Sequence, residues 1–251
     1  MTLRVQLNAV ARLCYFNGIL PLWRSPLLIA AVFLTPFSFL FFLKVIAPAA
    51  LFPFGVVGGI LFTTLFTGNG MLNDCAYLRL ERQLQQIFVA SPVRPASYIL
   101  GMALSELAFA LPATVLFVVI LALVLPLSVL GVLGLIGVIL LTWLMASSLG
   151  FLVSTFFRQL REIWPIGTLV FSTISVLPPV FYPIGVIPEA YRWVAFLAPS
   201  TFAAQLADRA AGLPNLTSGL LGNFGFLLGG LGLLTLFFAL AASFLARWRE
   251  P

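Results

Sequence analysis

The stretch SYILGMALSELAFALPATVLFVVILALVLPLSVLGVLGLIGVILLTWLMASSLGFLVSTFF, residues 97–157, decides the fold. It contains two apolar runs, 97–125 and 129–157, and each exceeds the roughly 20 residues that an α-helix needs to cross a bilayer. Only residues 126–128 separate them, so the runs predict two transmembrane helices joined by a tight turn. A barrel strand would instead alternate apolar and polar residues over about ten positions.

The composition of the 251-residue chain excludes a soluble globular domain. Hydrophobic residues make up 62% of the chain and charged residues only 8%, whereas soluble domains carry about 25% charged residues. In lipid, backbone polar groups must be satisfied within the chain, so long apolar runs predict helices. Six spans can be read, at about 26–47, 50–72, 97–125, 129–157, 163–181 and 218–246. We expect an all-α integral membrane protein with a single transmembrane domain over residues 1–251.

Few side chains offer groups for chemistry. The chain has no histidine, which excludes histidine-based triads and histidine metal sites. Its single lysine, Lys44, stands in FFLKVIA without the glycine-rich turn of a phosphate-binding loop. We therefore expect no catalytic residue, no metal site and no bound cofactor. Energy for uphill movement would have to come from a partner or an ion gradient.

Basic residues indicate the orientation in the membrane. Ten of the 13 Lys and Arg residues fall on one set of loops and termini, and the other three are Lys44, Arg192 and Arg209. Because cytoplasmic loops are enriched in basic residues, we expect both termini in the cytoplasm, with the chain in the inner (plasma) membrane. This bias also accounts for the net charge of +6. No Lys/Arg-rich run indicates a nucleic-acid partner.

Residues 1–25 include an amphipathic segment, TLRVQLNAVARLCYF. Arg4, Asn8 and Arg12 recur at every fourth position and share one helical face, while most of the leucines lie on other faces. A basic amphipathic helix suits the inner membrane interface. The alternative is a loosely attached positive tail.

One long cytoplasmic loop, 74–96, separates the second and third spans. From Tyr77 to Ala90 it contains neither glycine nor proline, which predicts a short helix. Pro92 and Pro95 then end it, because proline lacks an N–H and disfavours helix at the preceding residue. The helix has a hydrophobic face, so we expect it to dock on a partner, and a solvated tether is the alternative.

Glu106 is the one ionisable residue placed deep within a predicted span. A carboxylate there costs about 2.5–3.5 kcal/mol on insertion scales, so it should face protein or water. One interpretation is a residue that lines a transport pathway. The alternatives are a structural acid bonded to Ser105, Thr114 or a neighbouring helix, and an acid close enough to the membrane interface to stay hydrated. The many phenylalanines of the first two spans are interpreted as packing and lipid-facing residues rather than as a binding surface.

The segment PPVFYPIGVIPEAYRWVAFLAPSTF, residues 178–202, lies between the fifth and sixth spans. Its prolines cut it into pieces too short to cross a membrane, and Pro188-Glu189 is typical of a helix start. We expect an outer re-entrant segment over 182–217, with a short helix at about 189–197 that covers the outer end of a pathway. A plain interfacial helix is the alternative. The residues expected at this outer gate are Pro178, Phe181, Pro183, Pro188, Tyr191 and Pro199.

Two patches resemble the membrane-spanning permeases of ABC-2 type exporters. The first, LERQLQQIFVASPVRPASYILGMALSEL, has the family's charged, leucine-rich stretch followed by Ser91-Pro92-Val93 and Ile99-Leu100-Gly101. The second, PPVFYPIGVIPEAYRWVAFLAPSTFAAQLADR, carries the family's proline landmarks and ends in Asp208-Arg209. Two regions depart from the family: Gln83, Leu84 and Gln85 occupy the region of a usual Gly-Thr-Leu-Glu, and Ala198 replaces a usual asparagine.

The resemblance implies an assembly around this chain. Two permease copies, expected to be identical, would pair around a central pathway in the lipid, above two ATPase subunits that bind the ATP and Mg. The loop helix would be the coupling helix that docks on the ATPase. The expected contact residues are Arg79, Leu80, Glu81, Arg82, Leu84, Gln85, Ile87 and Phe88.

The expected function is ATP-driven outward transport of an amphipathic cargo, drug-like or lipid, without catalysis by this chain. A lipid-linked glycan or polysaccharide is the alternative cargo. Two other classes remain as rivals. One is an ion-coupled carrier or channel that uses Glu106, and the other is a lipid-modifying enzyme, for which the sequence offers no convergent polar groups.

Overall fold

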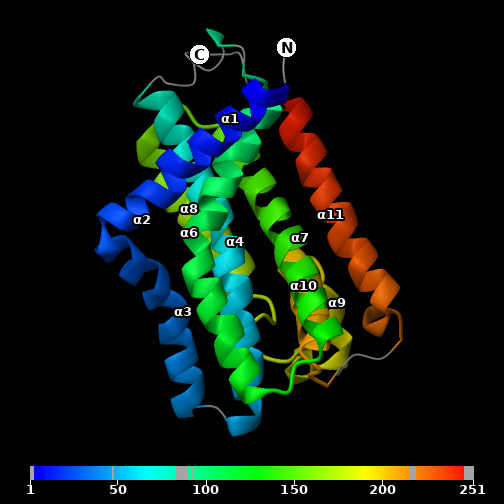
Figure 1. The fold of residues 1–251 in the computed structure, drawn as a ribbon. Helices are drawn as coiled ribbons and strands as arrows, with labels where there is room; N and C mark the ends of the chain where they lie inside the picture. Colours follow the sequence, from blue (N-terminus) through cyan, green and yellow to red (C-terminus); the bar gives the residue numbers. More distant parts are fainter. Residues whose placement is uncertain (1–2, 47, 83–89, 92, 215–218, 246–251) are drawn as a thin grey trace.

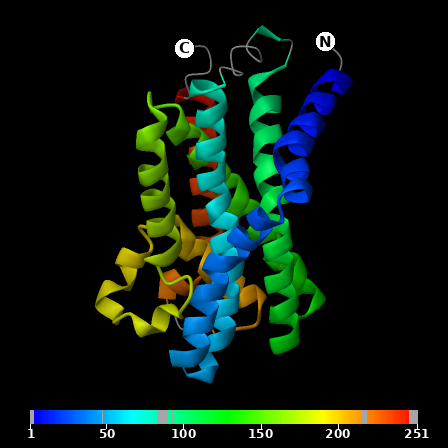
Figure 2. The same ribbon diagram turned by 90° about the vertical axis from the view of Figure 1, so that its left-hand side faces the viewer.

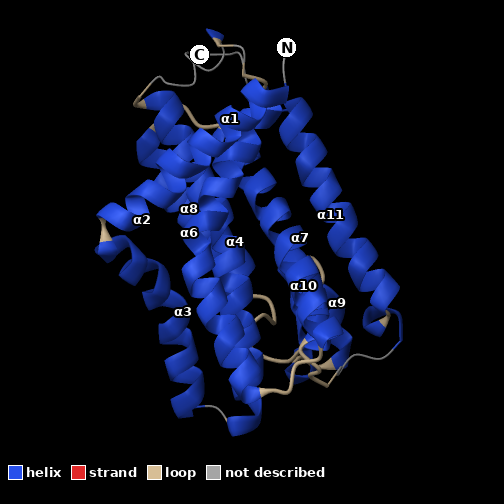
Figure 3. Cartoon of the chain, in the orientation of Figure 1, coloured by secondary structure: helices blue, strands red, loops and turns tan. Residues whose placement is uncertain are grey.

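The computed structural model describes residues 3–46, 48–82, 90–91, 93–214 and 219–245. Within these residues every regular element is helical (Figures 1 and 3). Four helices are long and apolar enough to cross a membrane. They are α4 (Phe52–Leu80), α6 (Pro95–Val124), α7 (Val129–Ser154) and α11 (Phe224–Leu245). The all-α membrane fold is thus confirmed, while the count of six spans stays a prediction.

The two remaining long helices are α3 and α8. α3 (Pro26–Ile46) contains 21 residues and α8 (Leu160–Val176) contains 17. Both pack against α4, which also contacts α6 and α7 and so forms the centre of the bundle (Figure 1). Figure 2 shows α8 on one side of α4, with α1 and α6 on the other. The central position explains why Val56, Val57 and Ile60 of α4 are fully buried.

Helices α4 and α7 approach closely because glycines face each other at their crossing. A Cβ atom on Gly150 of α7 would collide with the backbone carbonyl of Gly68 on α4. Small residues of this kind let helix backbones pack in lipid, where no hydrophobic effect drives helices together. Trp143 of α7 adds a polar link, since its indole N–H donates to the Ala103 carbonyl of α6 at 2.9 Å.

The N-terminal segment is helical, as expected, but it is bent. It consists of α1 (Leu3–Cys14), the π-helical η1 (Tyr15–Ile19) and α2 (Leu20–Arg24). Gly18 packs directly on the backbone of Ser105, and Leu13 packs on Gly101 of α6. The buried Gln6 side chain accepts a hydrogen bond from the Arg94 N–H at 3.0 Å. These contacts fix the segment against α6, and its place at a membrane interface stays a prediction.

The tight hairpin between α6 and α7 is confirmed. The Ser128 hydroxyl caps α7 by accepting from the Gly131 N–H at 3.0 Å. This turn lies at one end of the bundle. The opposite end holds α1, the last turn of α4 and the start of α6 (Figure 1).

Three predicted span boundaries are wrong. α4 continues to Leu80 rather than ending at Leu72, because no glycine or proline interrupts the last turns and Arg79 finds hydrogen-bond acceptors there. α8 ends at Val176 rather than at 181, since Pro178 and Pro179 follow. α11 begins at Phe224 rather than at 218.

The segment after α8 forms short helical pieces at the end of the bundle opposite α1. They are η3 (Ile184–Val186), η4 (Glu189–Tyr191), α9 (Arg192–Ala195) and α10 (Pro199–Ala210), followed by η5 (Gly219–Gly222). The helix start at Glu189 is confirmed, but the single helix expected over 189–197 is instead a 3-10 turn followed by one α-helical turn. α10 packs against α4, α7 and α11, with residues 200–208 buried.

Candidate functional site

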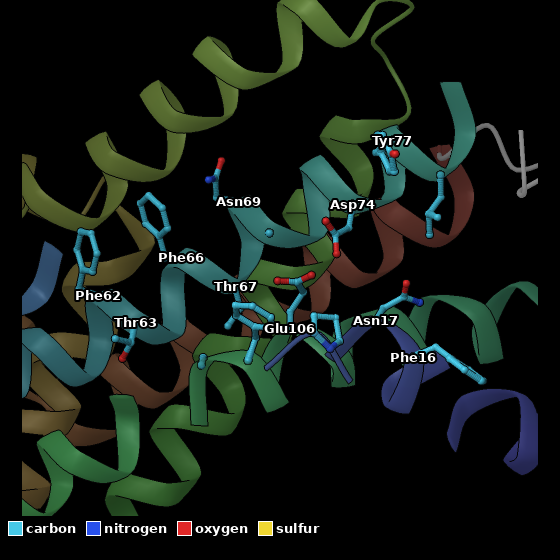
Figure 4. Close-up of a pocket in the computed structure, with 15 residues that line it drawn as sticks. Phe16, Asn17, Phe62, Thr63, Phe66, Thr67, Asn69, Asp74, Tyr77 and Glu106 are labelled. Atoms are coloured by element: carbon cyan, nitrogen blue, oxygen red, sulfur yellow. The ribbon is translucent and has the colours of Figure 1, made fainter. Parts of the chain in front are cut away.

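A cleft of about 520 Å³ lies between α4, α6 and the η1–α2 segment. It is in the half of the bundle nearer to α1. A volume in the range of roughly 300–1,000 Å³ is typical of ligand pockets. Figure 4 shows the rings of Phe62 and Phe66 towards one end of this cleft, and Phe16 and Tyr77 towards the other.

Two carboxyl groups face each other within the cleft. Asp74 comes from α4 and Glu106 from α6, and they point toward one another within hydrogen-bonding reach (Figure 4). The absence of a side chain at Gly70 allows the Glu106 carboxyl to approach α4, because a Cβ atom at this position would collide with that carboxyl. The side chain of Glu106 is therefore seated directly against the backbone of α4.

The structure decides between the partners considered for Glu106. The Ser105 hydroxyl donates to the Met102 carbonyl at 2.6 Å, and Thr114 pairs with Thr63 of α4 at 3.2 Å. Neither is therefore the partner of Glu106, which is Asp74 on a neighbouring helix. Glu106 also lines the cleft, so its position fits the predicted pathway residue, and that role stays a prediction.

Asp74 is the site residue that the sequence reasoning missed. Ending the second span at Leu72 placed Asp74 in a loop, whereas the observed helix carries it along one face. Residues at intervals of four and three line the cleft from α4: Thr63, Thr67, Gly70, Asp74 and Tyr77. This polar stripe, at helical spacing in an otherwise apolar helix, is the sequence signal that could have found it.

None of the described residues that line the cleft is an arginine or a lysine. Arg79, one turn beyond Asp74, turns the other way. Its guanidinium donates to the carbonyls of Ser154, Thr155 and Phe157 at 2.7, 3.0 and 2.6 Å. A cation at a helix C-terminus is favourable because the last carbonyls have no partners within the helix. Arg79 thus fastens the end of α4 to the end of α7.

The predicted ATPase contacts fall into two groups. Leu84, Gln85, Ile87 and Phe88 lie outside the described residues. Of the others, Arg79 and Leu80 belong to the last turn of α4, while Glu81 and Arg82 follow it and are exposed. The Arg82 Nε–H donates to the Tyr77 hydroxyl at 2.9 Å. The structure therefore exposes Glu81 and Arg82 at the end of the bundle where a partner would dock, and docking stays a prediction.

The predicted outer-gate residues also divide into two groups. Pro178, Phe181 and Pro183 are buried, and the Phe181 ring stacks on Phe39 with ring centroids 5.0 Å apart. Pro188 and Tyr191 are exposed, while Pro199 is half-buried at the first turn of α10. The six residues differ in exposure, and their role as a gate stays a prediction.

Asp208, near the end of α10, is a second buried acid. Burial raises the pKa of its carboxyl well above the ordinary value. Within the described residues its Oδ1 atom has no hydrogen-bond partner. Asp208 is enclosed, since only 7% of its surface is exposed, and it is not among the residues that line the cleft between α4, α6 and the η1–α2 segment.

Comparison with known proteins identifies the family. The sequence profile of ABC-2 type transporters matches residues 11–208, which include the N-terminal segment after its first residues, α3 to α10 and all of the cleft. A search of curated proteins finds no match. Because the profile covers most of the 251 residues, the chain belongs to the ABC-2 type transporter family as a membrane-spanning permease component.

Proposed function

We propose that this chain is the permease of an ATP-driven exporter that moves an amphipathic cargo, drug-like or lipid, outward across the plasma membrane. The observation that carries the proposal is the ligand-sized cleft beside the central helix of an ABC-2 type membrane domain. A cleft lined by aromatic rings and a few polar groups suits a cargo with an apolar body and a polar head.

The arrangement of basic residues supports cytoplasmic termini in this proposal. Arg12, Arg79, Arg94 and Arg158 belong to segments at the end of the bundle that carries α1 (Figure 1). Arg192 belongs to the opposite end. The positive-inside tendency would then place α1 and the mouth of the cleft on the cytoplasmic side.

Energy would come from two separate ATPase subunits that hold the ATP and Mg, below two permease copies. The proposed docking element is the stretch from Arg79 to Phe88, whose exposed start is Glu81 and Arg82. Arg79 would transmit displacement of this element, because its hydrogen bonds tie α4 to the end of α7. A homodimer remains part of the proposal and rests on the family resemblance.

Two other candidates concern the same cleft. A lipid-linked glycan could place its lipid part against the rings and its hydroxyls against the polar side chains of the lining, which are Asn17, Thr63, Thr67, Asn69, Asp74, Tyr77 and Glu106. An ion-coupled carrier could use the Asp74–Glu106 pair. The drug-like or lipid cargo is favoured because apolar surface dominates the lining.

The test is co-purification of the tagged chain in mild detergent, with ATP hydrolysis measured on the purified complex. We expect a soluble ATPase in the complex and hydrolysis that responds to cargo. The charge-reversed variant Glu81→Arg with Arg82→Glu should lose the cargo response while its thermal unfolding midpoint stays unchanged.

The matched control is Arg161→Glu, which alters an exposed charge on α8 at the same end of the bundle. It should leave the cargo response intact. A wild-type response in the Glu81/Arg82 variant would contradict the docking assignment, and a complex without any ATPase would contradict the exporter function.

A further inference from the structure

The acid pair in the cleft lacks a counter-charge. Carboxylates withdrawn from water are normally paired with cations or coordinate metals, and Asp74 and Glu106 are both half-buried. Within the described residues, the one salt bridge joins Arg192 to Glu189 near the opposite end of the bundle, so neither Asp74 nor Glu106 has a cationic partner. Of the nearby arginines, Arg79 donates to backbone carbonyls and Arg82 donates to Tyr77, while Arg12 lines an adjoining cavity and is not among the residues that line the cleft.

The pair can be balanced in two ways. A hydrogen bond between two carboxyl groups requires that one of them carries a proton, because an ionised carboxylate only accepts. The alternative is a bound cation: a monovalent cation balances a pair that still shares one proton, and a dication balances two ionised carboxylates. The other groups on the packed elements that bear on this balance are Tyr77 and Cys75 of α4 and Tyr98 of α6, and none of them is cationic.

The cleft offers too few ligands for a metal ion. The described residues contain no group of three or more histidine, cysteine, aspartate and glutamate side chains that could hold one. Hard cations such as calcium take six to eight oxygen ligands. Two carboxyl groups flanked mainly by rings and apolar side chains do not provide them.

The surrounding rings suit an organic cation instead. Five aromatic side chains line the cleft, namely Phe16, Phe62, Phe66, Tyr77 and Phe109. The face of an aromatic ring attracts a cation, and its area also covers the apolar part of a ligand. The cleft therefore combines a negative centre with apolar ends, and its size fits a small organic molecule.

We infer that the cleft binds amphipathic organic cations, with Asp74 and Glu106 balancing the positive charge and the aromatic rings holding the apolar body. This inference rests on the proposed function only for the claim that the bound cation is cargo. Binding itself requires no ATPase and no nucleotide.

The test compares two probes of the same shape and opposite charge. The purified full-length chain in phosphatidylcholine nanodiscs is dialysed to equilibrium against tetraphenylphosphonium or tetraphenylborate, and binding to empty nanodiscs is subtracted. We expect saturable binding of tetraphenylphosphonium at least tenfold tighter than any saturable binding of tetraphenylborate. Equal affinity for the two probes, or no saturable binding of the cation, would overturn the inference.

Variants then locate the site. Asp74→Asn and Glu106→Gln keep the shape of each side chain and should each weaken cation binding about tenfold. The matched control Glu162→Gln removes an exposed acid of α8 outside the cleft and should bind like the wild type. Cation affinity unchanged in both cleft variants would overturn the assignment. Should either variant fail to fold, the wild-type comparison of the two probes still decides.

The two proposals fail separately. If the cation binds through Asp74 and Glu106 but ATP drives no export of it with the ATPase present, the binding site stands and the exporter function is contradicted for this cargo. If ATP-driven export of other amphiphiles occurs without any preference for cations, the exporter stands and the cation site is overturned.

Discussion

At the end of the bundle that carries α1, two carboxyl groups meet in an open cleft, whereas at the opposite end the carboxyl of Asp208 is enclosed by packed helices. Both ends place acids in an apolar protein. At the first end the acids face a space that a ligand can enter, and α4 is anchored through polar contacts of Arg79. At the second end aromatic and small side chains fill the interior, including Phe181 and residues of α10. The two ends therefore differ in the accessibility of their acids: Asp74 and Glu106 are half-buried and border a cavity, whereas Asp208 is buried among packed helices.

The largest expected effect tests packing at the end opposite α1. Phe181→Ala removes a ring that is 5% exposed and stacked on Phe39. Truncation of a buried phenylalanine costs about 3–5 kcal/mol, so the unfolding free energy should fall by that amount. The measurement is thermal or denaturant unfolding in detergent. Trp193→Ala is the control, since that side chain is 60% exposed, and an equal loss in both variants would contradict tight packing here.

The next effect tests the polar anchor at the α1 end. Arg79→Ala leaves three carbonyls at the end of α7 without their charged donor. Hydrogen bonds to charged groups contribute about 1.5–3 kcal/mol each before relaxation, and we expect a net loss of about 3 kcal/mol in unfolding free energy. Arg82→Ala should cost less than about 0.5 kcal/mol, because Arg82 is exposed. A similar cost for the two arginines would argue against the anchor.

A third variant tests whether the cleft must stay open. Gly70→Leu places a side chain where the Glu106 carboxyl now lies. Overpacking of this kind costs about 1–3 kcal/mol, and the blocked cleft should lower transport or cation binding more than tenfold. The control is Gly137→Leu on α7, where a Cβ atom meets nothing within 4 Å. Normal binding in Gly70→Leu would show that the cleft is not the site.

The smallest effect concerns Asp208 and pH. Burial raises the pKa of this carboxyl above its ordinary value of 3.8. A raised folded-state pKa contributes stability that is fully present below the ordinary pKa and is lost as the pH rises through the folded-state pKa. Asp208→Asn removes this dependence, so the variant should gain stability relative to the wild type as the pH increases.

The measurement for Asp208 is the unfolding midpoint of both proteins across pH 4 to 8. We expect a difference that grows with pH in favour of the asparagine variant. A difference in unfolding midpoint that does not change with pH would mean that the Asp208 carboxyl has the same pKa in the folded and unfolded states. That result would contradict the enclosure of Asp208 by packed helices.

Much of this fold could be predicted from the sequence because apolar length and proline position are local signals. The hairpin at 126–128 and the helix start after Pro188 are examples. The Asp74–Glu106 pair is different, since 32 residues separate its members and only the packing of α4 on α6 joins them. The hydrogen bonds of Arg79 could not be predicted from the sequence either. Their acceptors are backbone carbonyls at the end of α7, and every residue has a backbone carbonyl whatever its side chain.

The most direct measurement for the central claim uses sealed proteoliposomes that contain the purified chain, with and without its co-purifying ATPase. We expect that a labelled amphipathic cation accumulates against its gradient only when the ATPase and ATP are both present, and that the chain alone moves none uphill. Uphill accumulation by the chain alone, driven by a proton gradient and without ATP, would contradict this expectation.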